Sequence, residues 1–135
     1  GPFRADRSLR RNLGERLSVR SIACELALVA DGTYQYTVFG GPHSWDVAAG
    51  VLLVQEAQGQ VLTRLPGKSG WHPFSSFNTA SEDGPPGQKT LREWHQTILA
   101  GNPEMVEYVG SRLRLRRRWL LRTLFGLRWG SVRRG

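Results

Sequence analysis

Hydrophobic positions divide the chain into short segments with two different periods. Within 21–30 and 45–57, and again after 103, apolar residues recur at the three- and four-residue intervals of a helix. Other runs are rich in β-branched and aromatic residues and end at Gly or Pro, which is typical of strands. We expect helices near 20–30, 45–57 and from 103 onward, and strands near 33–39, 60–65 and 97–100. This alternating order favours an α/β fold in which helices are layered on a sheet.

The helix expected at 45–57 is apolar on every side. Pro42 blocks a helix upstream, and Ser44 can cap the first turn. One stripe holds Trp45, Ala48, Ala49, Leu52 and Leu53, and Val47, Val51 and Val54 fill the opposite face. A helix that is hydrophobic all round is usually buried, so we expect both faces to be covered, with Gly50 allowing a neighbouring backbone to come close. Gln58 and Gly59 end the helix, and Gly59 is expected to take the left-handed conformation there.

The remaining body is expected to be less regular. Residues 66–90 predict a long loop in which 71–74 folds back as a hydrophobic anchor and 81–89 is loose. Residues 91–96 predict a short helical turn. Cys24, the single cysteine, lies on the apolar side of its predicted helix and is expected to be a small buried side chain. Because it has no partner for a disulfide, the composition suits a reducing cytoplasm, and we expect a cytoplasmic protein.

Charge is distributed unevenly along the chain. The formal net charge is +8, yet residues 1–109 contain ten Lys or Arg and eleven Asp or Glu, whereas 110–135 contain nine Arg and no acidic residue. The arginine-rich first twenty residues predict a solvated basic linker. The final segment predicts a basic amphipathic helix that suits an anionic membrane or nucleic acid, or that packs on the body.

Asp46 is the carboxylate in the first turn of the apolar helix at 45–57. At this position backbone N–H groups point outward and the helix dipole favours a negative charge. The residue is therefore either an ordinary first-turn acid on a core helix or a functional carboxylate. The local pattern alone leaves both interpretations open.

A family resemblance bears on this choice. The motif Trp-Asp-x-Ala-Ala-Gly at 45–50, followed by Leu-Leu-Val-Gln-Glu-Ala-Gln-Gly and a strand, resembles the second signature of the inositol monophosphatase family of metal-dependent phosphatases. Three further stretches, at 21–32, 33–39 and 98–103, are similar to family segments in the same order. The resemblance covers roughly 16–109, the C-terminal half of such an enzyme, and implies helices layered on a mixed sheet. We accordingly divide the chain into a lead-in at 1–15, a family domain at 16–109 and an Arg-rich tail at 110–135.

The resemblance also implies a site. Asp46 would be a Mg²⁺ ligand, and Ser21, Phe39 and His43 would lie near the substrate; Phe39 stands where inositol-specific members have a glutamate that contacts a hydroxyl. The family's other metal ligands come from a glutamate pair and an Asp-Pro-x-Asp-Gly-Thr motif, and neither occurs in 1–135. We therefore expect the chain, which begins with Gly1 and not with Met, to be the C-terminal portion of a longer Mg²⁺-dependent phosphatase that is incomplete as a catalyst alone.

The implied substrate is a small phosphomonoester, inositol phosphate or a relative, with a place in inositol metabolism or phosphatidylinositol phosphate biosynthesis. The implied partners are the missing N-terminal half of the same chain and a possible second copy in a homodimer. Relatives that act on fructose bisphosphate, histidinol phosphate or phosphoadenosine phosphate leave the substrate open. The rival interpretation is a non-catalytic binding module that uses its Arg-rich tail on an anionic membrane or a partner.

Overall fold

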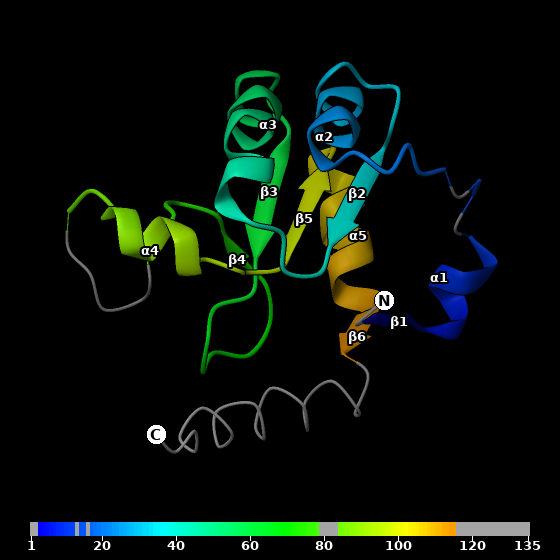
Figure 1. Ribbon diagram of the computed structural model, residues 1–135. Helices are drawn as coiled ribbons and strands as arrows, with labels where there is room; N and C mark the ends of the chain where they lie inside the picture. The colour runs from blue at the N-terminus through cyan, green and yellow to red at the C-terminus, as the bar shows by residue number, and fades with distance from the viewer. Residues whose placement is uncertain (1–2, 13, 16, 79–83, 116–135) are drawn as a thin grey trace, which may run out of the picture. The chain divides into compact units, whose positions relative to one another are not determined.

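The computed structural model describes residues 3–12, 14–15, 17–78 and 84–115. These residues fall into two compact units (Figure 1). The larger unit is formed by 14–111 and contains every candidate site residue. The smaller unit is formed by the described residues at the two ends of the chain, 3–12 and 112–115.

The larger unit is an α/β domain, as the alternating pattern predicted. Its elements are α2 (Ile22–Ala30), β2 (Tyr36–Phe39), α3 (Ser44–Glu56), β3 (Gln60–Thr63), β4 (His72–Pro73), α4 (Gln88–Glu93), β5 (Ile98–Gly101) and α5 (Pro103–Arg112). The three helices and three strands expected from periodicity are therefore all present. Each begins and ends within a few residues of the expected position, except that the last helix ends at Arg112.

The sheet has the strand order β2-β5-β3-β4, and every pairing in it is antiparallel. We expected a mixed sheet. Strands β2 and β3 do point the same way, because the crossover helix α3 joins them, and such a connection favours parallel strands. However, β5 enters between them and runs antiparallel to both. No parallel neighbours remain in the part of the sheet that the structure describes.

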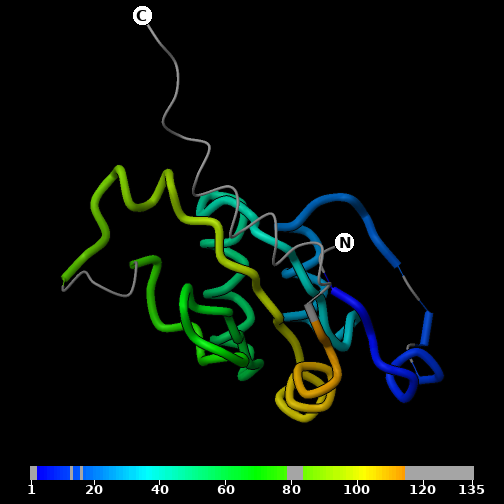
Figure 2. The backbone as a smooth tube through the Cα atoms, turned by 90° about the horizontal axis from the view of Figure 1, so that it is seen from below, coloured from blue at the N-terminus to red at the C-terminus, as the bar shows by residue number. Residues whose placement is uncertain are grey.

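Helices cover both faces of this sheet. Helices α2 and α3 lie side by side over one face (Figure 1), where their side chains join Ile98 and Ala100 of β5 in the hydrophobic core. Side chains alternate along a strand, so Leu99 faces the other side, where it lies against Gly110 of α5. Figure 2 shows α5 as the orange coil that directly follows the yellow trace of β5. The domain therefore has three layers: α2 with α3, the sheet, and α5.

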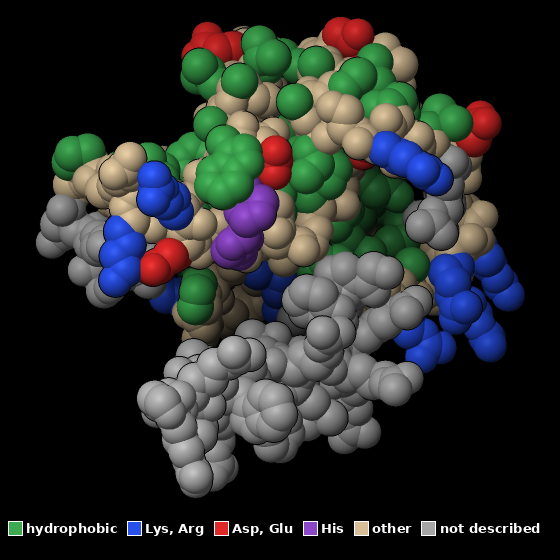
Figure 3. Space-filling view, viewed as in Figure 1, with side chains coloured by type: hydrophobic (Ala, Val, Ile, Leu, Met, Phe, Trp, Pro, Cys, Tyr) green, Lys and Arg blue, Asp and Glu red, His purple; other side chains and the backbone are tan. Residues whose placement is uncertain are grey.

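Helix α3 is covered on one side only, which contradicts the expectation that it is buried all round. Val47, Val51 and Val54 are buried, as predicted. By contrast, Trp45, Leu52 and Leu53 are 61%, 58% and 50% exposed. Helix α2 is similar: Cys24 is exposed, not buried as expected, beside the exposed Ala23 and Ala27. Figure 3 shows hydrophobic side chains, in green, spread over the surface of α2 and α3. Both helices are apolar on two sides, while the described residues pack only against one.

The end of α3 also differs from the prediction. Gln58, not Gly59, takes the left-handed conformation, with a φ of 63°. Gly59 is needed for a different reason: a Cβ there would lie 2.7 Å from Val54 Cγ1 and 3.2 Å from the carbonyl oxygen of Gly101. Gly59 therefore permits close packing of the turn on β5, while Gln58 takes the strained left-handed backbone conformation.

The segment between β3 and β5 folds back on the body, as expected for 71–74. The Phe74 amide donates to the Val61 carbonyl at 2.9 Å, and Phe74 packs edge to face with Phe77 and Trp94. Trp94 is buried. The helical turn spans Gln88–Glu93, earlier than the expected 91–96, so 88 and 89 are not loose; residues 79–83 lie outside the described part of the chain.

The smaller unit contains β1 (Phe3–Ala5), α1 (Arg7–Arg11) and β6 (Leu113–Leu115). Strands β1 and β6 pair antiparallel, and Asp6 caps α1 by accepting a hydrogen bond from the Leu9 amide at 2.8 Å. The described part of the basic lead-in thus contains a strand and a helix, and 113–115 is a strand where we expected helix. Residues 116–135, most of the predicted amphipathic tail, lie outside the described residues, so its proposed binding to membrane or nucleic acid stays a prediction. Among the described helices, none is long and apolar enough to span a membrane.

Candidate active site

Asp46 lies in the first turn of α3, as predicted. The helix starts after His43, whose extended backbone (φ −76°, ψ 155°) makes it the N-cap residue. The Asp46 amide donates to the His43 carbonyl at 3.1 Å, which holds the carboxylate at the helix start. Its side chain is half-buried and forms no hydrogen bond or ion pair with any described residue. The carboxylate is therefore available to bind a cation at a position where the helix dipole stabilises its charge.

Ser44 does not cap α3, although the sequence suggested it. It is the first helical residue, and its buried hydroxyl donates to the Leu91 carbonyl at 2.7 Å. This hydrogen bond ties α4 to the start of α3. The sequence could not predict the contact, because the two residues are far apart along the chain.

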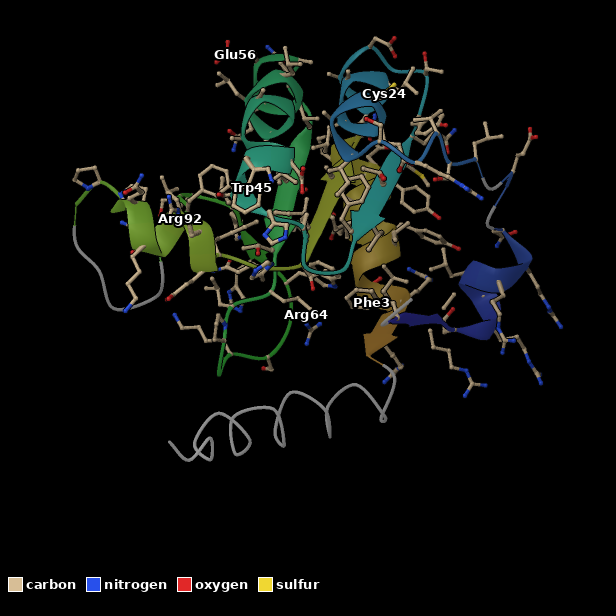
Figure 4. The ribbon with its side chains drawn as sticks, in the orientation of Figure 1. Phe3, Cys24, Trp45, Glu56, Arg64 and Arg92 are labelled. Carbon is tan, nitrogen blue, oxygen red and sulfur yellow. The ribbon has the colours of Figure 1, made fainter. Side chains whose placement is uncertain are left out.

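The ring of His43 is held between two other rings. It stacks on Trp45, with ring centroids 4.2 Å apart and an interplanar angle of 9°. It also meets His95 edge to face, at 4.3 Å between centroids. His43 Nδ1 is buried without a hydrogen-bond partner among the described residues. Figure 4 labels Trp45 at the start of α3, and Figure 3 shows histidine side chains gathered there. No spacing in the sequence linked His43 with His95.

Ser21 is the N-cap of α2, where its hydroxyl accepts a hydrogen bond from the Cys24 amide at 3.4 Å. The residue is exposed, so its hydroxyl can also reach a ligand. Arg20, just before it, has a φ of 59°, in the left-handed region. This conformation costs a residue with a side chain about 1–2 kcal/mol and is free for glycine. The chain therefore has a glycine-like backbone at this position with an arginine side chain.

Phe39 ends β2, where it pairs with Ile98 of β5. Its partly buried side chain packs against the hydrophobic core. An aromatic ring has no hydrogen-bonding group for a sugar hydroxyl, and packing accounts for its presence here. Whether Phe39 also borders a substrate stays a prediction.

Glu25 is a residue of this region that the sequence reasoning missed. It is 8% exposed and accepts hydrogen bonds from the Ser18 hydroxyl, the Val19 amide and the Thr37 hydroxyl. The available signal was a single carboxylate inside the otherwise apolar run Ile22–Ala30.

Near the other end of α2, the hydroxyl and the amide of Thr33 hydrogen-bond to the exposed Asp31 and lower its pKa.

A magnesium ion takes six oxygen ligands in near-octahedral geometry. Asp46 offers the hard oxygen donor that Mg²⁺ prefers. However, the described residues contain no group of three or more His, Cys, Asp or Glu side chains that could hold a metal ion. This part of the chain thus fits one position in a Mg²⁺ coordination shell and does not form a complete site.

The layered α/β domain, with a carboxylate at the start of an apolar helix, has a phosphatase-like fold. Comparison with protein families identifies the type: the model of the inositol monophosphatase family matches residues 3–104. The chain therefore belongs to the inositol monophosphatase family, whose members are generally Mg²⁺-dependent phosphatases. Neither the comparison with curated proteins nor that with solved structures gave a match.

Proposed function

We propose that residues 1–135 supply one Mg²⁺ ligand, Asp46, and part of the substrate pocket of a phosphomonoesterase. The substrate would be inositol phosphate or a related small phosphate. The observation that carries the proposal is the Asp46 carboxylate, which is half-buried at a helix start, has no described partner, and lies in a member of a phosphatase family.

The roles of the residues follow from their chemistry. Bound Mg²⁺ would supply the charge that activates water and stabilises the leaving oxygen. Asp46 would hold the ion with a carboxylate oxygen. The exposed Ser21 hydroxyl would donate to a substrate oxygen, and the His43 ring, fixed by Trp45 and His95, would border the same space. The fixed ring loses little freedom on binding, which favours its use as a contact.

The remaining metal ligands must come from outside the described residues. The exposed surface of α2 and α3 supports a further protein segment, packed on it, as the source of these ligands. The exposed apolar stripe of α3 begins at Trp45, next to Asp46. Exposed contiguous apolar surfaces commonly mark interaction sites. A segment that packs on this stripe can bring acidic side chains to Asp46, so we propose that the preceding part of the same protein covers it. A second copy of this chain would cover the stripe without adding the missing acidic motifs.

The experiment combines 1–135 with the segment that carries the remaining acidic motifs; we call this the completed protein. It should release inorganic phosphate from inositol monophosphate or a related phosphomonoester with Mg²⁺, and lose that activity when the metal is chelated. The chain 1–135 alone should release none. Phosphate release by 1–135 alone, or release that is indifferent to chelation, would contradict the proposal.

Substrate choice gives a separate prediction. Because Phe39 has no polar group for a substrate hydroxyl, the completed protein should discriminate poorly in favour of inositol monophosphate and tolerate aryl phosphates. We expect kcat/KM for the two substrate types to lie within about tenfold, since a hydrophobic pocket provides only small discrimination. Phe39→Glu should raise the preference for inositol monophosphate, with the melting temperature checked because Phe39 packs on the core. A strong preference for inositol monophosphate in the unaltered protein would count against this interpretation.

A further inference from the structure

Glu25 is a buried carboxylate that joins three parts of the larger unit. Its Oε1 accepts hydrogen bonds from the Ser18 hydroxyl at 2.7 Å and from the Val19 amide at 3.2 Å. Its Oε2 accepts from the hydroxyl of Thr37, itself buried on β2, at 3.2 Å. A carboxylate that leaves water needs such donors, and hydrogen bonds to a charged acceptor are stronger than neutral ones. The incoming segment at 18–19, helix α2 and strand β2 therefore meet at one charged group.

The segment that Glu25 holds contains the strained residue Arg20. The Arg20 amide donates to the Ser18 hydroxyl oxygen at 3.3 Å, and that hydroxyl in turn donates to Glu25. On the other side of Arg20, Ser21 is fixed as the N-cap of α2. A non-glycine residue keeps a left-handed backbone only where its surroundings determine the conformation. Here the anchor is Glu25, which is the buried member of this hydrogen-bonded chain.

We infer that Glu25 is a positioning residue for the candidate active site. By holding 18–19, it fixes the backbone of Arg20 and, through it, the orientation in which Ser21 presents its hydroxyl. The guanidinium of Arg20 forms no ion pair with a described carboxylate, so it remains available to an anionic group. The effect on substrate rests on the proposed phosphatase function; the effect on the conformation of 18–20 does not.

The first test measures that conformation in the chain 1–135. Trypsin cleavage after Arg20, identified by mass, should be about tenfold or more faster in Glu25→Ala than in the unaltered chain, because opening of the segment no longer breaks charged hydrogen bonds. Glu25→Gln keeps the shape and one acceptor oxygen, so it should restore most of the protection. Cleavage after the exposed Lys68, in a different turn, provides the internal reference.

A matched control removes a buried hydrogen bond elsewhere. Thr63→Val deletes the bond from the Thr63 hydroxyl to Gln96 Oε1, 2.9 Å long and also buried, without touching 18–20. It should leave cleavage after Arg20 unchanged. Unchanged cleavage in Glu25→Ala, or equal acceleration by Thr63→Val, would overturn the inference whether or not the protein is a phosphatase.

The second test uses the completed protein and separates a positioning role from a structural one. Glu25→Ala should raise KM about tenfold and change kcat by less than about twofold, because substrate contacts are lost without loss of the metal ligand. Thr63→Val should change neither. Faster cleavage after Arg20 with an unchanged KM would show that Glu25 is merely structural and would overturn the positioning role, while the proposed function would stand. Absence of Mg²⁺-dependent activity in the unaltered completed protein would refute the proposed function and the substrate role of Glu25 together, and cleavage after Arg20 would still decide its effect on the backbone.

Discussion

Replacing Asp46 with asparagine should remove the Mg²⁺-dependent phosphatase activity of the completed protein and leave its fold intact. Asparagine is nearly isosteric with aspartate and also suits a first helical turn. A neutral amide, however, binds a hard dication far less well than a carboxylate. The charge of the bound ion stabilises the transition state by several kcal/mol. We therefore expect Asp46→Asn to lower turnover by about a thousandfold or more. Phosphate release and the melting temperature are measured on the same preparations.

The control for Asp46→Asn is Glu56→Gln, which removes one carboxylate charge from the exposed far end of the same helix. It should leave turnover unchanged. If Asp46 were only a first-turn acid, its replacement would cost about 0.3–1 kcal/mol of stability through the helix dipole and would not affect turnover per folded molecule. A lower melting temperature with unchanged turnover would therefore exclude the metal-ligand role.

Gly50→Ala should destabilise the larger unit by about 1–3 kcal/mol, the usual cost of overpacking a well-packed core. A Cβ at this position would lie 2.5 Å from both Cβ and Cδ1 of Leu26 on α2. Leu26 is fully buried, and its Cβ cannot move without its backbone, so the two helices would have to separate. Alanine favours a helix over glycine by roughly 1 kcal/mol, and this gain offsets only part of the loss. Urea unfolding of the two proteins measures the difference.

Gln58→Gly is the matched control on the same segment, with the opposite expected sign. Glycine removes the strain of about 1–2 kcal/mol that the left-handed conformation imposes on Gln58. It also adds about 0.5–1 kcal/mol of backbone entropy cost on folding, which offsets part of this gain. We expect a small gain in the free energy of unfolding.

If Gly50→Ala unfolded at the same urea concentration as the unaltered chain, the close contact between α2 and α3 would not hold in solution.

Local pattern was sufficient to locate most of the elements and the candidate carboxylate. The apolar stripes at helical spacing, Pro42, and the turn residues around Gly32 and Gly59 act within one or two turns of chain, which is why α2, α3, β3 and β5 were predictable. The order of these elements and the Trp-Asp-x-Ala-Ala-Gly motif were enough to identify the family, which the match over 3–104 confirmed. The roles of Asp46, Ser21, Phe39 and His43 remain predictions from that resemblance.

Periodicity could not say what covers an apolar face. The stripe of Trp45, Leu52 and Leu53 reads as core by its composition, but exposure depends on whether another layer is present, and the described residues provide none. The same reason explains the wrong expectation for Cys24. Whether β5 would add at an edge or enter between β2 and β3 was likewise undetermined, because strand pairing depends on the path of the whole chain.

The sequence by itself determined the helices α2, α3 and α5, three of the six described strands, the α/β class, the family and the place of Asp46 at a helix start, since these depend on residues close together in the chain. Only the tertiary structure decided which distant residues meet: His43 with His95, Ser44 with Leu91, and Glu25 with Ser18 and Thr37. It also placed the strained backbone at Gln58 and left Gly59 to the contact with β5. Such contacts form when packing brings remote segments together. They are stabilised by burial and by hydrogen bonds between distant residues, which the pattern of neighbouring residues does not predict.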